Sequence, residues 1–390
     1  MNRYERYLHL SAELIKSFNG EEPFSNHLKR FFLEHKKLGS RDRKQISTCC
    51  YAYFRTGHLL DDLDPKERIP KALFLFPTVS NPVLENLYPD LNSYINLSLE
   101  KKCILINIQG DENLIFPWIN HLSIGINASL FSLSHLQQPK LFLRIRPGKK
   151  DVVENKLKHN SILYDKINED AIALENGVDI SSVLHLDKEV VIQDYSSQRL
   201  SFFLLLVPYP NNQNISVWDC CAASGGKSIL CKDFFPNCSL TVSDIRASVL
   251  RNLSARFHRA GIEFKKILIA DLTKKTPSEL VENTFDLIIA DVPCTGSGTW
   301  SRTPEWLQYF KEEDIAEYSL LQQKIISNVI PCLKNGGYFL YSTCSVFSAE
   351  NEKQVEFMIQ HFELELIEMK IISGSECHAD TMFGALLKKK

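Results

Sequence analysis

The N-terminal part of the chain has a helical spacing of apolar positions. Within residues 24–32 and 46–54, phenylalanine, leucine, isoleucine, tyrosine and cysteine recur at intervals of about three or four positions, which places them on one face of a helix. This spacing predicts a helical domain over residues 1–135.

The pattern changes near Pro139. Residues 140–150 alternate apolar and basic side chains, as in an amphipathic strand with one cationic face. A helical stretch over 152–159 follows, and then short β-prone pieces around 162–164, 171–174 and 190–193. This succession predicts a small α+β subdomain over residues 136–205.

Residues 206–390 alternate short apolar runs with helical patterns. The runs end in aspartates, at Asp219, Asp244, Asp271 and Asp291. This predicts an α/β fold with a doubly wound, Rossmann-like parallel sheet that has a polar rim at the carboxyl ends of its strands. We further predict a helix from about Glu312 to Leu333 that is capped by residues 335–337, a strand over 338–344 and a helix over 348–361.

Composition narrows the classes of protein. The 390 residues are 44% hydrophobic with a formal net charge of -2, so the chain can build two or three cores, and a nucleic-acid site must be a local patch. The sequence has neither a membrane-length apolar run nor a signal-peptide core. The 11 cysteines are irregularly spaced without a Cys-x-x-Cys pair, which predicts a cytoplasmic protein with reduced thiols and no metal site.

Two basic segments are candidates for such a patch. Residues 36–44 hold five basic side chains against one acid, including Lys36, Lys37, Arg41 and Arg43. They suit either a solvated face or a phosphate-contacting loop, and Ser40 with Asp42 also suits a helix start.

The second basic segment, residues 140–150, contains Arg144 and Arg146. It suits an RNA-touching sheet face or an ordinary solvated edge strand that carries basic residues against aggregation.

The stretch from Asp286 to Trp300 is where chemistry is expected. An apolar run ends in Asp291, and Pro293, Cys294 and two glycines follow. In an open α/β sheet, ligands bind just beyond the carboxyl ends of the strands. The alternative is a buried cysteine in a glycine-rich turn.

A second glycine-rich turn follows Asp219. It comprises Cys221, Ala222, Ala223, Ser224, Gly225, Gly226 and Lys227. It lacks the dinucleotide and P-loop fingerprints, while Asp244 stands where an acid takes ribose hydroxyls and Asp271 would suit an adenine amino group. Each aspartate alone could be a helix N-cap. Together with Asp291 they predict a ligand with adenine and ribose but no phosphate, which is S-adenosylmethionine.

Three motifs carry a family resemblance. They are Asp219-Cys-Cys-Ala-Ala-Ser-Gly-Gly-Lys, Asp291-Val-Pro-Cys-Thr-Gly-Ser-Gly and Tyr341-Ser-Thr-Cys-Ser-Val-Phe-Ser-Ala-Glu-Asn-Glu. They resemble the Sun/nucleolar-protein family of S-adenosylmethionine-dependent RNA cytosine-5 methyltransferases. The resemblance covers roughly residues 190–390. It is weaker over 1–190, which look like the N-terminal helical and RRM-like parts of bacterial members acting on 16S ribosomal RNA, so that the subdomain over 136–205 is expected to be RRM-like. The family usually has proline where Ser224 stands, so Ser224 is expected to loosen the turn.

The resemblance implies roles for the site residues. Cys344 would attack carbon 6 of the cytosine, Cys294 would assist release, and Asp291 would stabilise the protonated ring nitrogen. Lys227 would position cofactor and site, and Arg302 would touch substrate. From the residues alone, the roles of the two cysteines are exchangeable, since cytosine-5 methyltransferases of DNA use the Pro-Cys cysteine as nucleophile.

The sequence therefore predicts an RNA cytosine-5 methyltransferase, acting on 16S ribosomal RNA with S-adenosylmethionine as cofactor. Transfer RNA as the substrate, or a non-catalytic RNA-binding ribosome assembly factor, are the alternatives. We expect a monomer with RNA as partner.

Overall fold

The computed structural model describes residues 2–75, 80–108, 112–210, 213–274, 276–277 and 279–390. The chain forms two compact units. Unit 1 comprises Met1–Asn120, Asn127–Gln138 and Thr299–Lys311, and unit 2 comprises His121–Ile126, Pro139–Gly298 and Glu312–Lys390.

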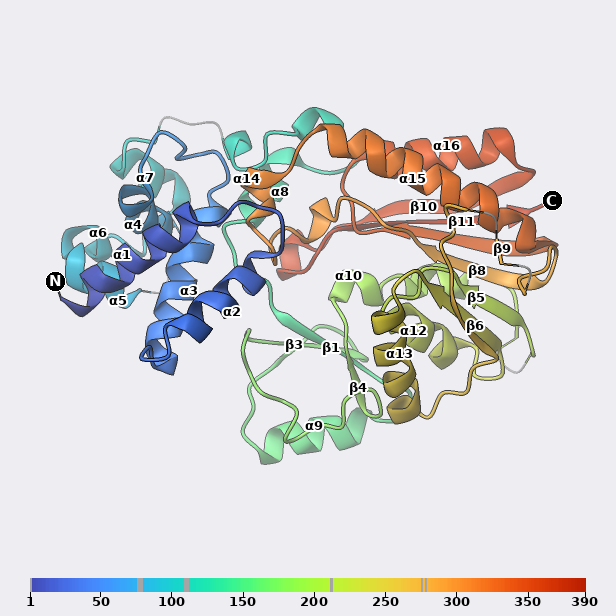
Figure 1. Cartoon of the computed structure of the whole chain (residues 1–390). Helices are drawn as coiled ribbons and strands as arrows, with labels where there is room; N and C mark the ends of the chain where they lie inside the picture. Colours follow the sequence, from blue (N-terminus) through green and yellow to red (C-terminus); the bar gives the residue numbers. More distant parts are fainter. Residues whose placement is uncertain (1, 76–79, 109–111, 211–212, 275, 278) are drawn as a thin grey trace. The chain divides into compact units, whose positions relative to one another are not determined.

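Unit 1 is helical, as its apolar spacing predicts (Figure 1). Its α-helices are α1 (Arg3–Lys16), α2 (Phe24–Glu34), α3 (Ser40–Arg55), α4 (Pro65–Leu75), α5 (Pro82–Leu87), α6 (Pro89–Ser93), α7 (Leu99–Leu105), α8 (Ala128–Ser134) and α14 (Trp306–Tyr309), with a 3-10 turn, η1 (Glu112–Leu114). Phe24, Ile46 and Phe54 are among its fully buried side chains. The predicted helix start at Ser40 is confirmed, because the Asp42 carboxylate accepts the Gly39 N–H at 2.9 Å.

Residues 299–311 fold into unit 1 although the sequence places them beside the cysteine motif. The buried Arg55 guanidinium donates to the Ser301 carbonyl at 2.7 Å, and Glu305 accepts the Phe24 N–H at 2.9 Å. The Trp300 and Phe310 rings lie 4.7 Å apart, centroid to centroid. Unit 1 is therefore built from three separate stretches of the sequence.

Unit 2 contains a small antiparallel sheet in the order β2-β3-β1-β4. Its elements are β1 (Leu141–Ile145), α9 (Lys150–His159), β2 (Asp165–Lys166), β3 (Ala171–Leu174) and β4 (Val190–Ile192). The predicted strand–helix–strand succession is present. The alternative of an edge strand within residues 140–150 is excluded, because β1 pairs with β3 on one side and β4 on the other.

The large sheet of unit 2 has seven strands in the order β10-β11-β9-β8-β5-β6-β7. Its strands are β5 (Ser216–Asp219), β6 (Ser239–Asp244), β7 (Lys266–Ile269), β8 (Phe285–Asp291), β9 (Leu333–Thr343), β10 (Leu364–Ile372) and β11 (Met382–Lys389). Strands β5 to β9 pair in parallel, whereas β10 and β11 are antiparallel. The predicted Rossmann-like parallel sheet is confirmed.

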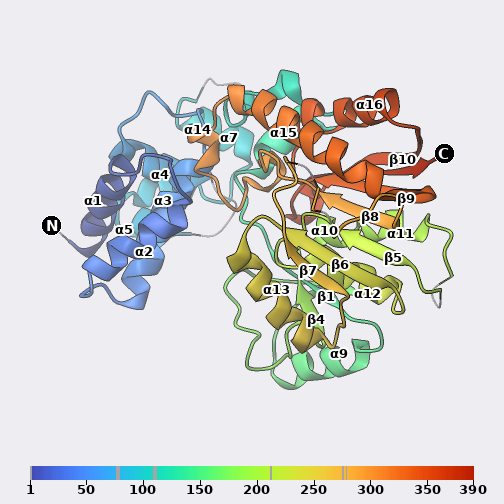
Figure 2. The same ribbon diagram turned by 45° about the vertical axis from the view of Figure 1, so that its right-hand side comes forward.

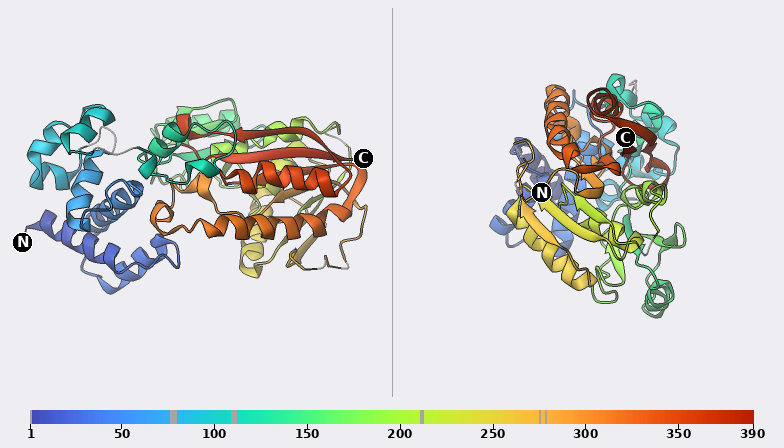
Figure 3. Two further views of the ribbon diagram at one scale, coloured as in Figure 1. Left: turned by 90° about the horizontal axis from the view of Figure 1, so that it is seen from above. Right: turned by 90° about the vertical axis from the view of Figure 1, so that its right-hand side faces the viewer.

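Helices cover both faces of this sheet, as doubly wound folds require (Figures 1 and 3). The helices of unit 2 besides α9 are α10 (Tyr195–Gln198), α11 (Ser201–Leu205), α12 (Gly226–Phe234), α13 (Ala247–Ala260), α15 (Glu313–Val329) and α16 (Glu352–His361), with 3-10 turns at η4 (Ile330–Cys332), η5 (Ser348–Glu350) and η6 (Ser375–Cys377). Two further 3-10 turns, η2 (Ile119–His121) and η3 (Ser297–Thr299), lie where the chain passes between units.

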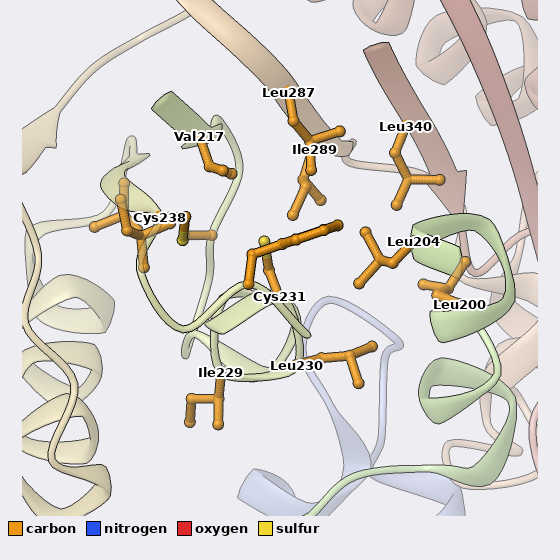
Figure 4. Close-up of a cluster of buried hydrophobic side chains, with 14 of the residues drawn as sticks. Leu200, Leu204, Val217, Ile229, Leu230, Cys231, Cys238, Leu287, Ile289 and Leu340 are labelled. Carbon is orange, nitrogen blue, oxygen red and sulfur yellow. The ribbon is translucent and has the colours of Figure 1, made fainter. Parts of the chain in front are cut away.

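Successive strand residues serve the two faces alternately. Val217, Ile289 and Leu340 pack with α11, α12 and α13 (Figure 4), while Trp218 and Ile288 pack with α15 and α16. This period of two, on strands that are apolar throughout, is what a sheet covered on both sides needs.

Two details of the predicted strand and helix ends are wrong. The long helix ends at Val329, followed by η4 with Pro331, and residues 335–337 lie in β9 and not in a helix cap. Leu333 is opposite Phe285 and Tyr338 opposite Leu287, so these residues form an irregularity in which Gly336 has φ +76°. Asp271 lies beyond the end of β7 at Ile269, and not on the strand itself.

Candidate active site

Cys294 and Cys344 meet at the carboxyl ends of two neighbouring strands. β8 and β9 run in parallel with Asp291 opposite Ser342, so the segments that follow them leave the sheet at the same edge. The two sulfurs lie 3.3 Å apart, and both side chains are half-buried. The structure thus brings together the two cysteines that the sequence selects.

An ion pair stands beside these sulfurs. Lys227, in the first turn of α12, donates to Asp291 Oδ2 at 2.6 Å, and the Ser342 hydroxyl donates to Asp291 Oδ1 at 2.9 Å. Burial alone would lower the pKa of Lys227, but the charge of Asp291, with a smaller contribution from Cys344, raises the pKa above its ordinary value. Lys227 therefore remains an ammonium group that fixes the Asp291 carboxylate.

The Cys294 thiol is held in its protonated form. The hydrogen bond with Cys344 and burial raise the pKa of Cys294 well above its ordinary value, and the negative charge of Glu350 acts in the same direction. Its S–H group can therefore donate to the Cys344 sulfur.

Glu350 connects the two cysteine segments, and the sequence reading gave it no role. Its carboxylate accepts the Thr295 N–H at 2.9 Å and the Ser345 hydroxyl at 2.5 Å, and Gln322 of α15 donates to it at 3.0 Å. The side chain is completely buried. Thr295 follows Cys294 and Ser345 follows Cys344. Glu350 therefore holds the two cysteine segments in fixed positions relative to each other.

The glycine-rich turn after β5 is shaped by its backbone. Ala223 has φ +45°, and its N–H donates to Asp244 Oδ2 at 3.0 Å. Gly225 has φ +83°, and a Cβ there would lie 2.8 Å from the Phe257 ring. Only glycine fits this position.

A pocket of about 440 Å³ opens between this turn and the cysteines. Of the residues predicted to bind a cofactor, Cys221, Ala223, Asp244, Asp271 and Asp291 line it, and Cys294 and Cys344 lie at its wall. The other members of the predicted set, Ala222, Ser224, Gly225, Gly226 and Lys227, support the turn without lining the pocket. Lining residues that the sequence did not indicate include Ile245, Arg246, Leu272, Thr273, Leu321 and Ile325.

Asp244 and Asp271, two of the three carboxylates that line the pocket, are charged and held by neighbours. Burial alone would raise the pKa of Asp244, but hydrogen bonds from Arg246 hold that pKa below its ordinary value. The Thr273 hydroxyl, which donates at 2.6 Å, lowers the pKa of Asp271. Two acceptor groups above apolar walls of leucine, isoleucine and valine fit an adenosine, with its ribose hydroxyls and amino group. The residues present therefore fit S-adenosylmethionine.

Asp219 does not line the pocket. It is completely buried and accepts the Ser228 hydroxyl at 2.6 Å. Burial raises the pKa of Asp219 to about 7. Its role is to tie β5 to α12.

The predicted RNA contacts fall into different environments. Arg144 and Arg146 bind Asp233 of α12 at 2.5 and 2.7 Å, and the Arg144 side chain is only 7% exposed. Their guanidinium groups thus form contacts inside unit 2, where the small sheet lies against α12 and α13 (Figure 2). We remove both from the candidate RNA contacts.

The other predicted RNA contacts belong to unit 1. Lys36, Lys37, Arg41 and Arg302 are exposed, whereas Arg43 is half-buried and donates to the Leu38 carbonyl at 3.0 Å.

Within the described part of the chain, no cluster of three or more histidine, cysteine, aspartate or glutamate side chains could hold a metal ion. None of the helices in the same residues has the length and apolar character to cross a membrane.

Comparisons with known proteins agree with this geometry. Residues 204–385 match the family model described as 16S rRNA methyltransferase RsmB/F. The ribosomal RNA small subunit methyltransferase B of Erwinia tasmaniensis is 33% identical over 204 residues, which are 51% of this chain and 45% of that protein. The chain spans about half the length of the curated relatives that it matches.

Two solved structures share the fold. One, of PH0851, has a TM-score of 0.72 at 20% identity and covers 100% of this chain and 99% of its own. The other, of a methyltransferase homolog protein from Pyrococcus horikoshii, has a TM-score of 0.59 at 20% identity and covers 75% of this chain and 100% of its own. The family resemblance that the motifs predict is confirmed over residues 204–385, which hold the pocket and both cysteines and match the RsmB/F family model.

Proposed function

We propose that the chain transfers a methyl group from S-adenosylmethionine to carbon 5 of a cytosine in 16S ribosomal RNA. The observation that carries the proposal is the pair of cysteine sulfurs, 3.3 Å apart at the wall of the pocket. The matching family and the names of the curated relatives support ribosomal RNA as the substrate.

In this reaction a nucleophile must add to the cytosine ring before the methyl group can be transferred. Carbon 5 of cytosine is too weakly nucleophilic to attack a methyl sulfonium, and a thiolate bonded to carbon 6 converts the ring into an enamine that can attack it. S-adenosylmethionine, when bound, supplies the electrophilic methyl group.

Cys344 provides that thiolate in our proposal. Its sulfur forms a bond to carbon 6, and the electron pair of the C5–C6 double bond shifts into the ring. Asp291, held by Lys227 and Ser342, accepts a hydrogen bond from the ring nitrogen that becomes protonated. The Lys227 ammonium, which is electrostatically coupled to Cys344, favours negative charge at this end of the sheet.

Cys294 completes the reaction: after its S–H proton has passed to solvent water, its thiolate removes the proton from carbon 5. The electrons of that C–H bond restore the C5–C6 double bond, and the bond between carbon 6 and the Cys344 sulfur breaks. The hydrogen bond to Cys344 is the largest cause of the raised pKa of Cys294. Once the Cys344 sulfur is bonded to carbon 6, that cause is removed and the pKa of Cys294 falls, so the Cys294 thiolate becomes available only after the adduct has formed.

Cofactor and RNA have separate binding groups. We assign Asp244 to the ribose hydroxyls and Asp271 to the adenine amino group, both at the pocket wall. The target cytosine must leave its stack to reach the sulfurs, which costs a few kcal/mol and favours a loop or bulge. Lys36, Lys37 and Arg41, all exposed, and Arg302 are our candidates for contacts to the RNA.

The proposal is tested by nucleoside mass spectrometry. The purified chain is incubated with S-adenosylmethionine and either unmodified 16S ribosomal RNA or transfer RNA, with Cys344→Ala as the control. We expect 5-methylcytidine in the ribosomal RNA alone and none with the variant. Methylation of transfer RNA instead would reassign the substrate, and binding of ribosomal RNA without 5-methylcytidine would favour a non-catalytic assembly factor.

A further inference from the structure

The family resemblance implies a proline at the position of Ser224 in the cofactor turn. The Gly225 N–H donates to the Ala222 carbonyl at 2.8 Å, which closes a turn with Ala223 and Ser224 at its centre. Proline at the second central position would fix the backbone there, and serine leaves it free. Yet the turn must keep the Ala223 N–H aimed at Asp244, at 3.0 Å, for the pocket to hold its shape.

A side chain from α13 supplies the missing restraint. The Arg256 guanidinium donates from Nη1 to the Ser224 carbonyl at 2.9 Å and to the Ser224 hydroxyl at 3.1 Å. The Ser224 N–H donates to no described residue, so a proline at this position would lose no hydrogen bond. Arg256 thus restrains the turn by binding the carbonyl and the hydroxyl of Ser224, whereas a proline would restrain the backbone through its ring.

Arg256 is itself held by the small subdomain. Its Nε donates to Asp187 Oδ1 at 2.9 Å, and the Asp187 side chain is only 5% exposed. Asp187 is fixed by its own N–H, which donates to the Val190 carbonyl at 2.7 Å, and by Arg146, which donates to the Asp187 carbonyl at 3.0 Å. A connected path of hydrogen bonds therefore runs from the segment before β4 to the cofactor turn.

We propose that Arg256 is a positioning residue that replaces the restraint of the family's proline, so that the small subdomain sets the affinity for S-adenosylmethionine through Asp187, Arg256 and Ser224. This inference rests on the proposed function, because it assigns the pocket to that cofactor. It makes the RRM-like subdomain part of the cofactor site, and not only a candidate RNA-binding module.

Arg259 is a matched control within the same helix. It binds the other oxygen of Asp187, with Nη2 to Oδ2 at 2.7 Å, so Arg259→Ala also removes a cation from Asp187. The structure shows no hydrogen bond between Arg259 and the described residues of the cofactor turn. An effect specific to Arg256→Ala therefore reports on the turn.

The test is calorimetric titration of S-adenosylmethionine into the full chain, with variants in two backgrounds. In the native background we expect Arg256→Ala to raise the dissociation constant about tenfold, because the charge-assisted hydrogen bonds that restrain the turn are lost. We expect Arg259→Ala to change it less than about twofold. In the Ser224→Pro background, Arg256→Ala should have little effect, because the proline already restrains the turn. Arg256→Lys, which keeps a cation for Asp187 but loses the fork of donors, should behave like Arg256→Ala.

The outcomes separate this inference from the proposed function. If the native chain does not bind S-adenosylmethionine, the proposed function fails. If it binds, and Arg256→Ala either matches Arg259→Ala or weakens binding equally in both backgrounds, the positioning role is wrong while the proposed function stands. Thermal unfolding of each variant identifies any that do not fold, and Arg256→Lys then provides the comparison.

Discussion

The two basic segments of the chain have similar compositions and opposite environments. In residues 36–44, Lys36, Lys37 and Arg41 extend into solvent at the start of α3. In residues 140–150, Arg144 and Arg146 turn inward and share Asp233. The number of charges does not explain the difference. The second segment lies on the central strand β1, between β3 and β4 and against α12, where a carboxylate is within reach.

A cluster of basic residues in the sequence therefore does not by itself identify an RNA contact. Arg144 and Arg146 stabilise the packing of the small sheet on α12 and α13. Lys36, Lys37 and Arg41 have the exposure that phosphate contacts need. Four predictions follow from the contrast, beginning with the largest effect.

The largest effect is expected from breaking the interior ion pair. Arg144→Ala leaves Asp233 buried with one cation fewer, and removal of one partner from a buried pair lowers the free energy of unfolding by about 3–5 kcal/mol. Denaturation with urea measures it. Lys36→Ala is the control, expected to change the free energy by less than about 0.5 kcal/mol. Equal urea midpoints for Arg144→Ala and Lys36→Ala would contradict the difference in environment between the two basic segments.

A second prediction compares two buried aspartates. Asp233 forms ion pairs with two arginines. Asp219 is different, because burial raises its pKa to about 7. A raised pKa means that the folded state keeps a proton that the unfolded state loses, so Asp219 favours folding below about pH 4 and this contribution is lost as the pH rises to about 7.

The measurement is the free energy of unfolding of the native chain and of Asp219→Asn across this pH range. The native chain should lose up to about 4 kcal/mol relative to the variant between pH 4 and 7. A difference that stays constant over this range would show that Asp219 ionises normally in the folded state.

The third prediction concerns RNA affinity. Lys36→Glu, Lys37→Glu and Arg41→Glu together should weaken RNA binding about 10- to 100-fold at low salt, and the dependence on salt should become shallower by about 0.7 per lost phosphate contact. Filter binding across a salt series measures both.

The matched control for the third prediction changes the charge of the other basic segment equally, with Lys140→Glu, Lys149→Glu and Lys150→Glu. Since Lys140 and Lys150 already pair with Asp165 and Glu169, a smaller loss is expected. Equal losses would mean that net charge, and not residues 36–44, governs binding.

The sequence predicted the site well where chemistry follows strand order. Cys294 and Cys344 follow apolar runs that become β8 and β9, and parallel neighbours bring their ends together without further information. The glycine turn and Asp244 were found for the same reason. Local pattern and topology are sufficient here.

What the sequence did not predict depends on partners far away in the chain. The roles of Glu350, Arg246 and Arg256 arise from side chains that meet only in the folded state. Residues 299–311 fold with unit 1 because Arg55 and Phe24, far away in the sequence, bind their backbone and side chains. The antiparallel strands β10 and β11 also escaped prediction, since no motif marks residues 364–389.

The covalent role of Cys344 is the central claim, and it is the fourth prediction. It is tested most directly by the intact mass of Cys294→Ala purified from cells, beside Cys344→Ala and the double variant. If Cys344 attacks and Cys294 releases, Cys294→Ala alone should carry covalently bound, methylated RNA, and the double variant should carry none. Trapped RNA on Cys344→Ala instead would reverse the two roles, and a complete absence of adducts would contradict the covalent mechanism.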